Sequence, residues 1–118
     1  MKKLLGIRGA VCCENSEVSI RKAVEELCEK IKAANDISTE DIVSVQFTVT
    51  DDITAFNPAT ALRNSNILGD VALFCSREPN FTGSLPFVIR VLITAYSPNC
   101  AKHIYCNGAE ILRPDLGV

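Results

Sequence analysis

The chain has 118 residues, of which 47% are hydrophobic, and its formal net charge at pH 7 is -2. This length suits one domain built around one core, so we assign residues 1–118 to a single domain. A nearly neutral chain gives no electrostatic reason to expect nucleic acid or an anionic membrane as a partner. The N-terminal apolar segment is interrupted at Arg8, too early for a secretion signal, and no apolar run reaches the roughly 20 residues of a membrane helix. We therefore expect a cytoplasmic protein.

The cysteines give no sign of a metal centre or of a disulfide framework. No Cys-x-x-Cys pair occurs, and His103 is the sole histidine. Zinc sites usually need close pairs of ligands, and disulfides are rare in proteins that are not secreted. We therefore expect no metal site and interpret most cysteines as small buried hydrophobic residues. They are Cys12, Cys13, Cys28, Cys75, Cys100 and Cys106.

The N-terminal half reads as strand, helix and strand. Leu4–Cys13 contains Val, Ile and Leu, which predicts a first strand with Arg8 inside it. Ser16 offers an N-cap, and apolar residues at helical spacing predict an amphipathic helix of about five turns that ends near Asn35. Ile42–Thr50 is rich in β-branched residues and predicts a second strand.

A second, shorter helix follows. Asn57 is a suitable N-cap and Pro58 suits the first helical position. We expect the helix to continue through Ala59–Leu68 and to stop at Gly69. Val71–Ser76 then predicts a third strand.

The C-terminal third predicts three further strands. Phe87–Ala95 is the most apolar run of the chain and predicts a buried strand, interrupted by the charge of Arg90. His103–Cys106 and Ala109–Leu112 flank Asn107-Gly108, a dipeptide typical of a type I′ hairpin turn. We expect an α+β domain whose mixed sheet carries one long and one short helix on one face. Open edges and an exposed apolar face favour oligomerisation.

Arg90 raises the first question of function. A guanidinium does not lose its proton, and its burial without an anion is costly. The nearest acid in the sequence is Glu78, on the segment before the strand. Arg90 therefore belongs either to a structural ion pair with Glu78 or to a pocket whose ligand is the anion. Arg8 and Arg63 have similar alternatives, as ordinary surface residues or as parts of the same site.

The residue types in the sequence limit which ligand and which reaction a pocket around Arg90 could serve. The chain has no Ser/His/Asp set, no phosphate-binding glycine loop and no dinucleotide-binding motif. Arginine forks bind carboxylates through two parallel hydrogen bonds, so several converging arginines suit a small dianion. Such a site can hold a reactive conformer and stabilise developing charge without proton transfer. The candidates are Arg8, Arg63, Arg90 and Arg113, with Glu78 and Tyr105.

A series of short motifs also carries a family resemblance. The motifs are Gly-Ile-Arg-Gly-Ala at residues 6–10, Pro58-Ala59 with Arg63, Cys75, Glu78, Thr82-Gly83, Ile89-Arg90-Val91, His103-Ile104-Tyr105 and Leu112-Arg113-Pro114-Asp115-Leu116. In this order and spacing they resemble the monofunctional chorismate mutases of the AroH class, over almost the whole chain.

The resemblance implies an isomerase that converts chorismate to prephenate by a concerted Claisen rearrangement. This step belongs to the shikimate-pathway branch that makes phenylalanine and tyrosine. The resemblance also implies a homotrimer with a pseudo-α/β-barrel at its centre and an active site between adjacent subunits. It implies no metal and no organic cofactor, because one C–O bond breaks as one C–C bond forms in a single step.

The resemblance further implies a role for each candidate. Arg90 donates to the ether oxygen, where negative charge grows, and also touches a carboxylate. Arg8 and Tyr105 hold the side-chain carboxylate. Glu78 accepts from the ring hydroxyl, and Cys75 shares that hydroxyl through its backbone.

Other residues match the mouth and walls of the family's site. Arg63 and Arg113 match residues that attract the dianion at the mouth. Thr60 stands where a lysine is expected and Asn57 where an aromatic residue is expected, which bears on substrate affinity more than on the chemical step. The apolar wall residues that the resemblance implies are Ala59, Leu73, Phe74 and Leu112. Thr60, at the mouth, is also among the expected substrate-binding residues.

Two other functions fit a trimer of this size. One is an imine or enamine hydrolase of the YjgF type, in which an arginine binds a carboxylate between subunits. The other is a non-catalytic, ligand-sensing trimer. Several separate cationic positions together with Glu78 fit a hydroxylated dicarboxylate better than a small amino-acid imine. The presence of both Arg90 and Glu78 argues against a sensor.

Overall fold

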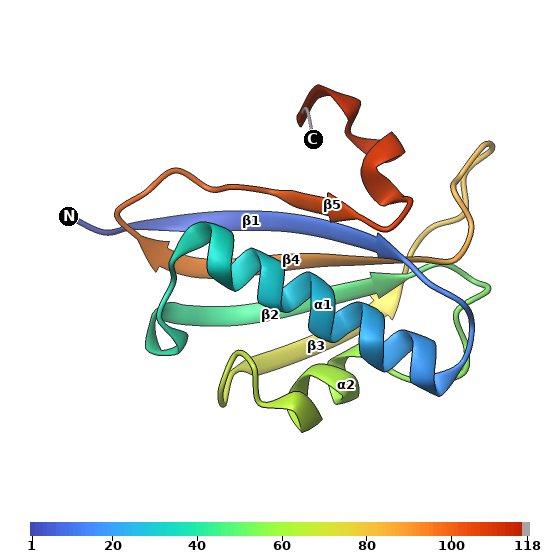
Figure 1. The fold of residues 1–118 in the computed structure, drawn as a ribbon, viewed down its shortest axis with the longest axis horizontal. Coiled ribbons are helices and arrows are strands. Elements are labelled where there is room, and N and C mark those ends of the chain that lie inside the picture. Colours follow the sequence, from blue (N-terminus) through green and yellow to red (C-terminus); the bar gives the residue numbers. More distant parts are fainter. Residues whose placement is uncertain (117–118) are drawn as a thin grey trace.

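Five strands form one mixed sheet in the order β3-β2-β4-β1-β5 in the computed structural model, which describes residues 1–116 (Figure 1). The central strand β4 runs antiparallel to β1 and β2 on its two sides. At the edges, β3 runs parallel to β2 and β5 runs parallel to β1. The strands are β1 Lys3–Cys12, β2 Ile42–Val49, β3 Ala72–Arg77, β4 Val88–Ser97 and β5 Ile104–Cys106. The predicted mixed sheet is confirmed.

The long helix α1 spans Glu17–Asn35, as its capping signal and periodicity predict. The hydroxyl of Ser16 accepts a hydrogen bond from the backbone N–H of Ser19 at 3.1 Å, which satisfies one of the free donors of the first turn. The helix ends at Asp36, which adopts a left-handed conformation with φ 48°. Figure 1 shows α1 and the short helix α2 on the same side of the sheet, as expected.

The short helix α2 spans Pro58–Ser65, which is three residues shorter than predicted. Its start agrees with the prediction, since Asn57 Oδ1 accepts from the backbone N–H of Ala59 at 2.8 Å. The end differs because Asn66 already adopts the left-handed conformation, with φ 59°, ahead of Gly69. Asparagine tolerates this region well, so the C-cap came from Asn66 rather than from glycine.

Alternation of side chains along the strands divides the sheet into a helix-covered face and an open face. Ile7, Phe47 and Ile93 are fully buried against the helices, where Leu27 and Ile31 of α1 meet them. On each strand, the residues next to these buried ones point to the open face, because successive side chains of a strand alternate. Part of the open face is covered by a smaller apolar cluster, made of Ala10, Val88, Tyr105 and Ala109.

The predicted C-terminal hairpin is wrong, although its turn residues behave as expected. Asn107 and Gly108 both have positive φ, 52° and 98°. The segment Ala109–Leu112 is nevertheless a 3-10 helix, η2, and not a strand. The fully buried Ala109 packs on the open face, and the backbone N–H of Gly108 donates to the Glu110 carboxylate at 2.7 Å. The chain therefore does not return as a further strand, and β5 remains an edge strand, with the C-terminal segment drawn beyond it in Figure 1.

The six cysteines are free thiols in environments that differ widely. Only Cys28 and Cys106 are buried, so the prediction that most cysteines are buried is wrong: Cys100 is exposed and the other three are half-buried. Burial raises the pKa of Cys13 to about 11 and that of Cys28 to about 12, so both stay protonated at neutral pH. Within residues 1–116, no helix has the length and apolar character needed to cross a membrane.

Candidate active site

The open face of the sheet holds a cavity of about 270 Å³. It brings together Arg8, Arg90 and Tyr105, three of the predicted site residues, from segments far apart in the sequence. The view in Figure 1 looks onto the helix-covered face, so this cavity lies on the far side of the sheet. The lining residues are Arg8, Gly9, Gln46, Thr48, Arg90, Val91, Leu92 and Tyr105.

Strand register explains how these side chains meet. Arg90 of β4 pairs with Ala10 of β1 on one side and with Thr48 of β2 on the other. Tyr105 of β5 pairs with the same Ala10. Paired residues project to the same face of a sheet, so Tyr105 and Arg90 flank a small alanine on the open face. Arg8 is two residues before Ala10 and therefore also points to the open face.

Arg90 has an unsatisfied hydrogen-bonding group in the cavity. Its side chain is 40% exposed, but its Nε atom is buried and has no hydrogen-bond acceptor among the described residues. The nearest anion is Glu78, whose Oε1 lies 3.5 Å from that Nε. The ion-pair alternative is therefore confirmed, whereas the ligand-binding alternative stays a prediction. Arg90 forms an ion pair with Glu78, and it also keeps donor capacity for a ligand.

Glu78 is held beside Arg90 by two contacts with β2. Its backbone N–H donates to the carbonyl of Val49 at 2.7 Å, which extends the pairing beyond the end of β3. Its Oε1 atom accepts a hydrogen bond from the hydroxyl of Thr48. These contacts place one carboxylate and one guanidinium next to each other on the open face.

Gly9 allows β5 and α1 to approach β1 closely. A Cβ at this position would lie 2.9 Å from the carbonyl oxygen of Ile104 and 2.9 Å from Cδ1 of Ile31. Real Cβ atoms do not tolerate such distances to backbone, so this close packing needs glycine. The glycine thereby sets the distance between Arg8 on β1 and Tyr105 on β5.

Arg113 follows η2 and lies near the Tyr105 side of the cavity. Its Nε and Nη2 donate to the two oxygens of Asp115 at 3.0 and 2.8 Å, a bidentate pair. The hydrogen bond with Asp115 raises the pKa of Arg113, and Tyr105 adds a smaller effect of the same sign. Leu112 packs with the small cluster that contains Tyr105. The C-terminal segment therefore brings Leu112 and Arg113 to the border of the cavity.

The chain does not bring the α2 residues to this cavity. Ala59 is buried in the helix-side core, Thr60 is half-buried and Arg63 is exposed. All three belong to α2, which packs on the face of the sheet opposite to Arg90. Within the chain, the sheet separates them from the cavity.

The β3 residues also lie apart from the cavity. Leu73 and Cys75 are packed against the helix-side core, and burial raises the pKa of the Cys75 thiol. Phe74 points to the open face and is 66% exposed. Phe74 pairs with Gln46, Gln46 with Leu92, and Leu92 with Arg8 across the sheet. The backbones of Phe74 and Arg8 are therefore three strand spacings apart, or roughly 14 Å.

Sequence reasoning missed Gln46 and Thr48. They are polar residues that alternate with the buried Val45 and Phe47 of β2, so the pattern alone places them on the open face. The alternation of buried and polar residues does not reveal the register of β2 against β4, which sets Thr48 opposite Arg90. Only that pairing makes them residues of the site.

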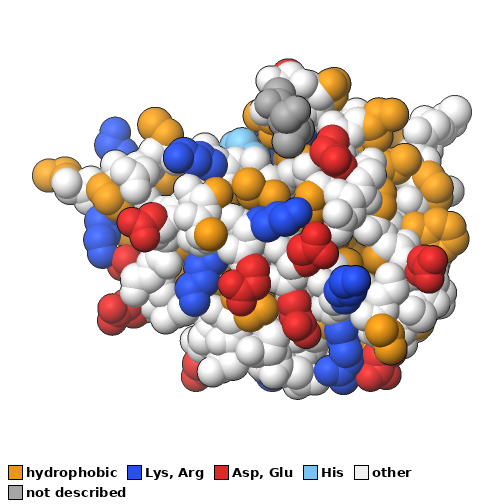
Figure 2. Space-filling model, viewed as in Figure 1, with side chains coloured by type: hydrophobic (Ala, Val, Ile, Leu, Met, Phe, Trp, Pro, Cys, Tyr) orange, Lys and Arg blue, Asp and Glu red, His pale blue; other side chains and the backbone are white. Residues whose placement is uncertain are grey.

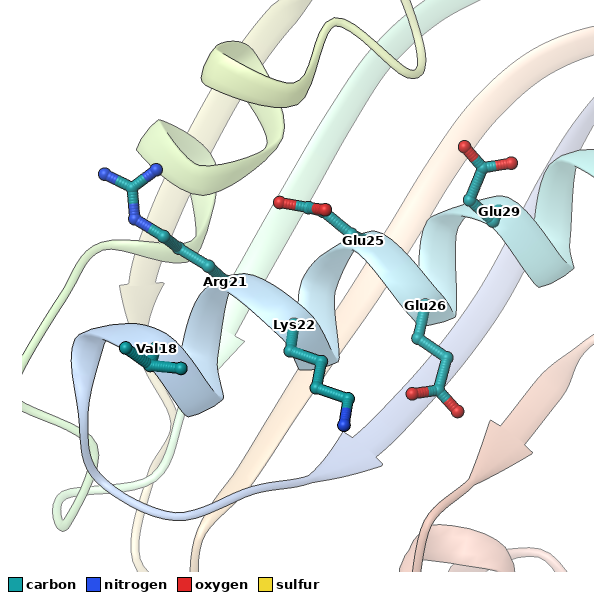
Figure 3. Close-up of a pocket in the computed structure, with 6 residues that line it drawn as sticks. All are labelled: Val18, Arg21, Lys22, Glu25, Glu26 and Glu29. Carbon is teal, nitrogen blue, oxygen red and sulfur yellow. The ribbon is translucent and has the colours of Figure 1, made fainter.

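A larger hollow lies over α1 but has none of the features of a site. Figure 3 shows its side chains on one helix, with Lys22 and Glu26 directed to one side and Arg21, Glu25 and Glu29 to the other. They do not converge on a common point. Figure 2 shows acidic and basic side chains interspersed over this face, as on an ordinary solvated helix surface.

No group of three or more His, Cys, Asp and Glu side chains within residues 1–116 could hold a metal ion. The cavity offers the chemistry of its cations and hydroxyls, with the Glu78 carboxylate beside Arg90. Two guanidiniums and a phenol can bind carboxylates, and the adjacent carboxylate can accept from a hydroxyl.

Comparison with known proteins points to one family. The family model of chorismate mutase type I matches residues 4–116. Chorismate mutase AroH of Thermus thermophilus is 42% identical over 116 residues, covering 94% of each chain. Chorismate mutase AroH of Bacillus subtilis (strain 168) is 34% identical, over 96% of this chain and 92% of the relative.

A solved structure has the same fold. The chorismate mutase from Clostridium thermocellum superposes with a TM-score of 0.85 at 34% sequence identity, covering 91% of this chain and 98% of that one. The family match extends over the strands that line the cavity and over the C-terminal segment that borders it. The chain therefore belongs to the chorismate mutase type I family.

Proposed function

We propose that the open-face cavity is the active site in which this chorismate mutase rearranges chorismate to prephenate. The observation that carries the assignment is the buried Nε of Arg90, which has no acceptor among residues 1–116 although it lies beside Glu78. A buried donor without a partner costs free energy in the free protein. A ligand oxygen in the cavity would remove that cost.

The rearrangement needs stabilisation of charge rather than proton transfer. The ether C–O bond breaks while a C–C bond forms, and negative charge grows on the ether oxygen. Arg90 is the donor for that oxygen, because a fixed guanidinium in a partly desolvated site stabilises developing charge without reorganisation. Loss of one such donor typically lowers kcat by about 100- to 1,000-fold.

Binding of the substrate follows from the groups around Arg90. Arg8 and Tyr105 hold the side-chain carboxylate, since they come from neighbouring strands and line the same cavity. Glu78 accepts a hydrogen bond from the ring hydroxyl. Thr48 fixes the carboxylate of Glu78 through Oε1 and so sets the direction in which it accepts. These groups hold the substrate in the conformer that reacts.

The assembly we propose is a homotrimer with active sites shared between adjacent subunits. The open face exposes large apolar side chains, among them Leu4, Phe74, Leu92 and Tyr96. Both sheet edges, β3 and β5, lack a neighbouring strand within residues 1–116. Burial of this surface against a second subunit would be favourable.

A shared site also accounts for the residues that one chain keeps apart. The mouth and wall residues on α2 and β3 would reach the cavity of the neighbouring subunit, whereas Arg113 and Leu112 approach their own cavity. Cys75 lies on the edge strand β3, whose outer backbone groups face no other strand of the described residues and could share the ring hydroxyl. The set assigned to the partner is Ala59, Thr60, Arg63, Leu73, Phe74 and Cys75.

The imine hydrolase and the sensing trimer gain no support from the comparisons, which name chorismate mutases. The cytoplasm is the compartment we propose, because all six cysteines are free thiols.

The decisive experiment follows the loss of chorismate absorbance on addition of purified protein and identifies prephenate as the product. Arg90→Ala is expected to lose activity by at least about 100-fold while it keeps the wild-type circular dichroism spectrum and assembly. The matched control is Arg21→Ala. It removes an arginine of α1, the helix that covers the face of the sheet opposite to the cavity. A folded Arg90→Ala variant with near-normal turnover would exclude the ether-oxygen role.

A further inference from the structure

His103 makes a long-range contact with the backbone of Arg8. The Nδ1 atom of its imidazole accepts a hydrogen bond from the backbone N–H of Arg8 at 2.9 Å. The β1–β5 ladder begins one residue later, with the pair Gly9 and Ile104. The imidazole therefore acts as an extra acceptor at the start of the ladder. It ties β1 to β5 at the residue that carries the Arg8 side chain.

This contact requires one protonation state of the ring. Nδ1 accepts only when it carries no proton, so the proton of the neutral imidazole is on Nε2. A doubly protonated ring would direct a second N–H at the N–H of Arg8, and the hydrogen bond would be lost. The acceptor is therefore present only while His103 is neutral.

The surroundings of His103 are mostly cationic. Arg8 on β1 and Arg113 after η2 act on the ring, and Lys30 of α1 lines a hollow with it. The titratable residues of β5 that line the same hollow are Tyr105 and Cys106. Burial, followed by the charges of Arg8 and Arg113, lowers the pKa of His103. The arrangement thus favours the neutral ring, the form that the hydrogen bond from Arg8 requires.

We infer that His103 is a positioning residue for carboxylate binding: its neutral imidazole fixes the backbone of Arg8 against β5, and so aligns Arg8 with Tyr105. The inference rests on the proposed function, in which these two side chains hold the substrate's side-chain carboxylate. His103 itself need not touch the substrate. Loss of the contact is therefore expected to weaken binding more than the chemical step.

Two substitutions separate the hydrogen bond from the general packing of the ring. In His103→Asn, the amide oxygen can take the position of Nδ1 and accept from Arg8. In His103→Gln, the oxygen lies one bond further out, nearer the position of Nε2. We expect His103→Asn to keep a KM close to that of the wild type and His103→Gln to raise it about fivefold, with kcat little changed in both. Equal KM values for the two variants would overturn the inference.

The pH dependence gives a second kinetic test. In the wild type, KM is expected to rise as the pH falls below about 6.5, the ordinary pKa of histidine, and through the lowered pKa of His103. In His103→Asn that rise should be absent, because the amide does not titrate. An acidic rise in KM of equal size in both proteins would show that another group is responsible.

An NMR titration tests the contact without relying on activity. In the wild type, the backbone amide of Arg8 is expected to shift with the same midpoint as the imidazole nitrogens of His103. In His103→Asn, this amide should not titrate over that range. A wild-type Arg8 amide that does not follow His103 would overturn the inference, whatever the activity. A coupled titration in a protein that does not convert chorismate would confirm the contact and refute the proposed function instead.

Discussion

The Nε atom of Arg90 and the Oε1 atom of Glu78 lie 3.5 Å apart and form an ion pair without a hydrogen bond. The same Oε1 accepts from the hydroxyl of Thr48. Glu78 is thus oriented by Thr48 while Arg90 keeps its Nε–H. A pair of this kind balances the charge of the guanidinium and still leaves the donor for a substrate.

Removal of the Thr48 hydroxyl should test the orientation of Glu78. We expect Thr48→Val to lower kcat/KM about fivefold, because one hydrogen bond that fixes the carboxylate is lost while the volume is kept. Steady-state kinetics with chorismate measure the effect. Thr94→Val is the matched control, since Thr94 lies on the same face but outside the cavity. Equal losses in the two variants would refute a specific role for Thr48.

Mixing two variants should test whether sites are shared between subunits. Arg90→Ala is expected to be nearly inactive, and Arg63→Ala to bind substrate weakly with a raised KM. If the two residues come from different subunits, mixed trimers contain some sites with both arginines. After joint refolding, activity at low substrate concentration should then exceed the average of the separate proteins. If no excess appears although mixed trimers form, Arg63 and Arg90 do not act across one interface.

Gly9 should be intolerant of a side chain for reasons of packing. Gly9→Ala places a Cβ 2.9 Å from the carbonyl oxygen of Ile104, and relief of that contact means moving β5 or α1. We expect a loss of about 1–3 kcal/mol in the free energy of unfolding, measured by denaturant titration. Gly6→Ala is the control, because its nearest neighbour is the Cδ1 atom of Leu92 at an ordinary 3.5 Å. A Gly9→Ala protein as stable as Gly6→Ala would contradict the close packing of β5.

The free energy of unfolding should depend on pH through His103. Burial and the charges of Arg8 and Arg113 lower its pKa in the folded protein, so the unfolded chain binds the proton more tightly. The contribution of His103 to stability is therefore complete above about 6.5, the pKa of histidine in the unfolded chain, and is lost as the pH falls through the lowered value. Denaturant titrations at pH 5 and pH 7 should show a loss in the wild type that is smaller in His103→Asn. An equal loss in both proteins would assign the effect to other groups.

The sequence by itself determined the local features of the fold, because they depend on neighbours only a few residues apart. Ser16 and the pair Asn57-Pro58 fixed the starts of the two helices through hydrogen bonds and backbone geometry within one turn. The charge of Arg90 in an apolar run indicated either an ion pair or a ligand site at this strand, because a guanidinium there needs an anion.

The tertiary structure decided everything that depends on register and on distant contacts. The positive φ values of Asn107 and Gly108 suit a hairpin, yet burial of Ala109 on the open face made the next segment a 3-10 helix. The meeting of Arg8, Arg90 and Tyr105 follows from the pairing of β1 with β4 and β5, between residues as far apart as Ala10 and Arg90. Local composition does not encode such pairings. They are selected by the burial of one whole face of the sheet, since a shift of one residue would turn every buried side chain outward.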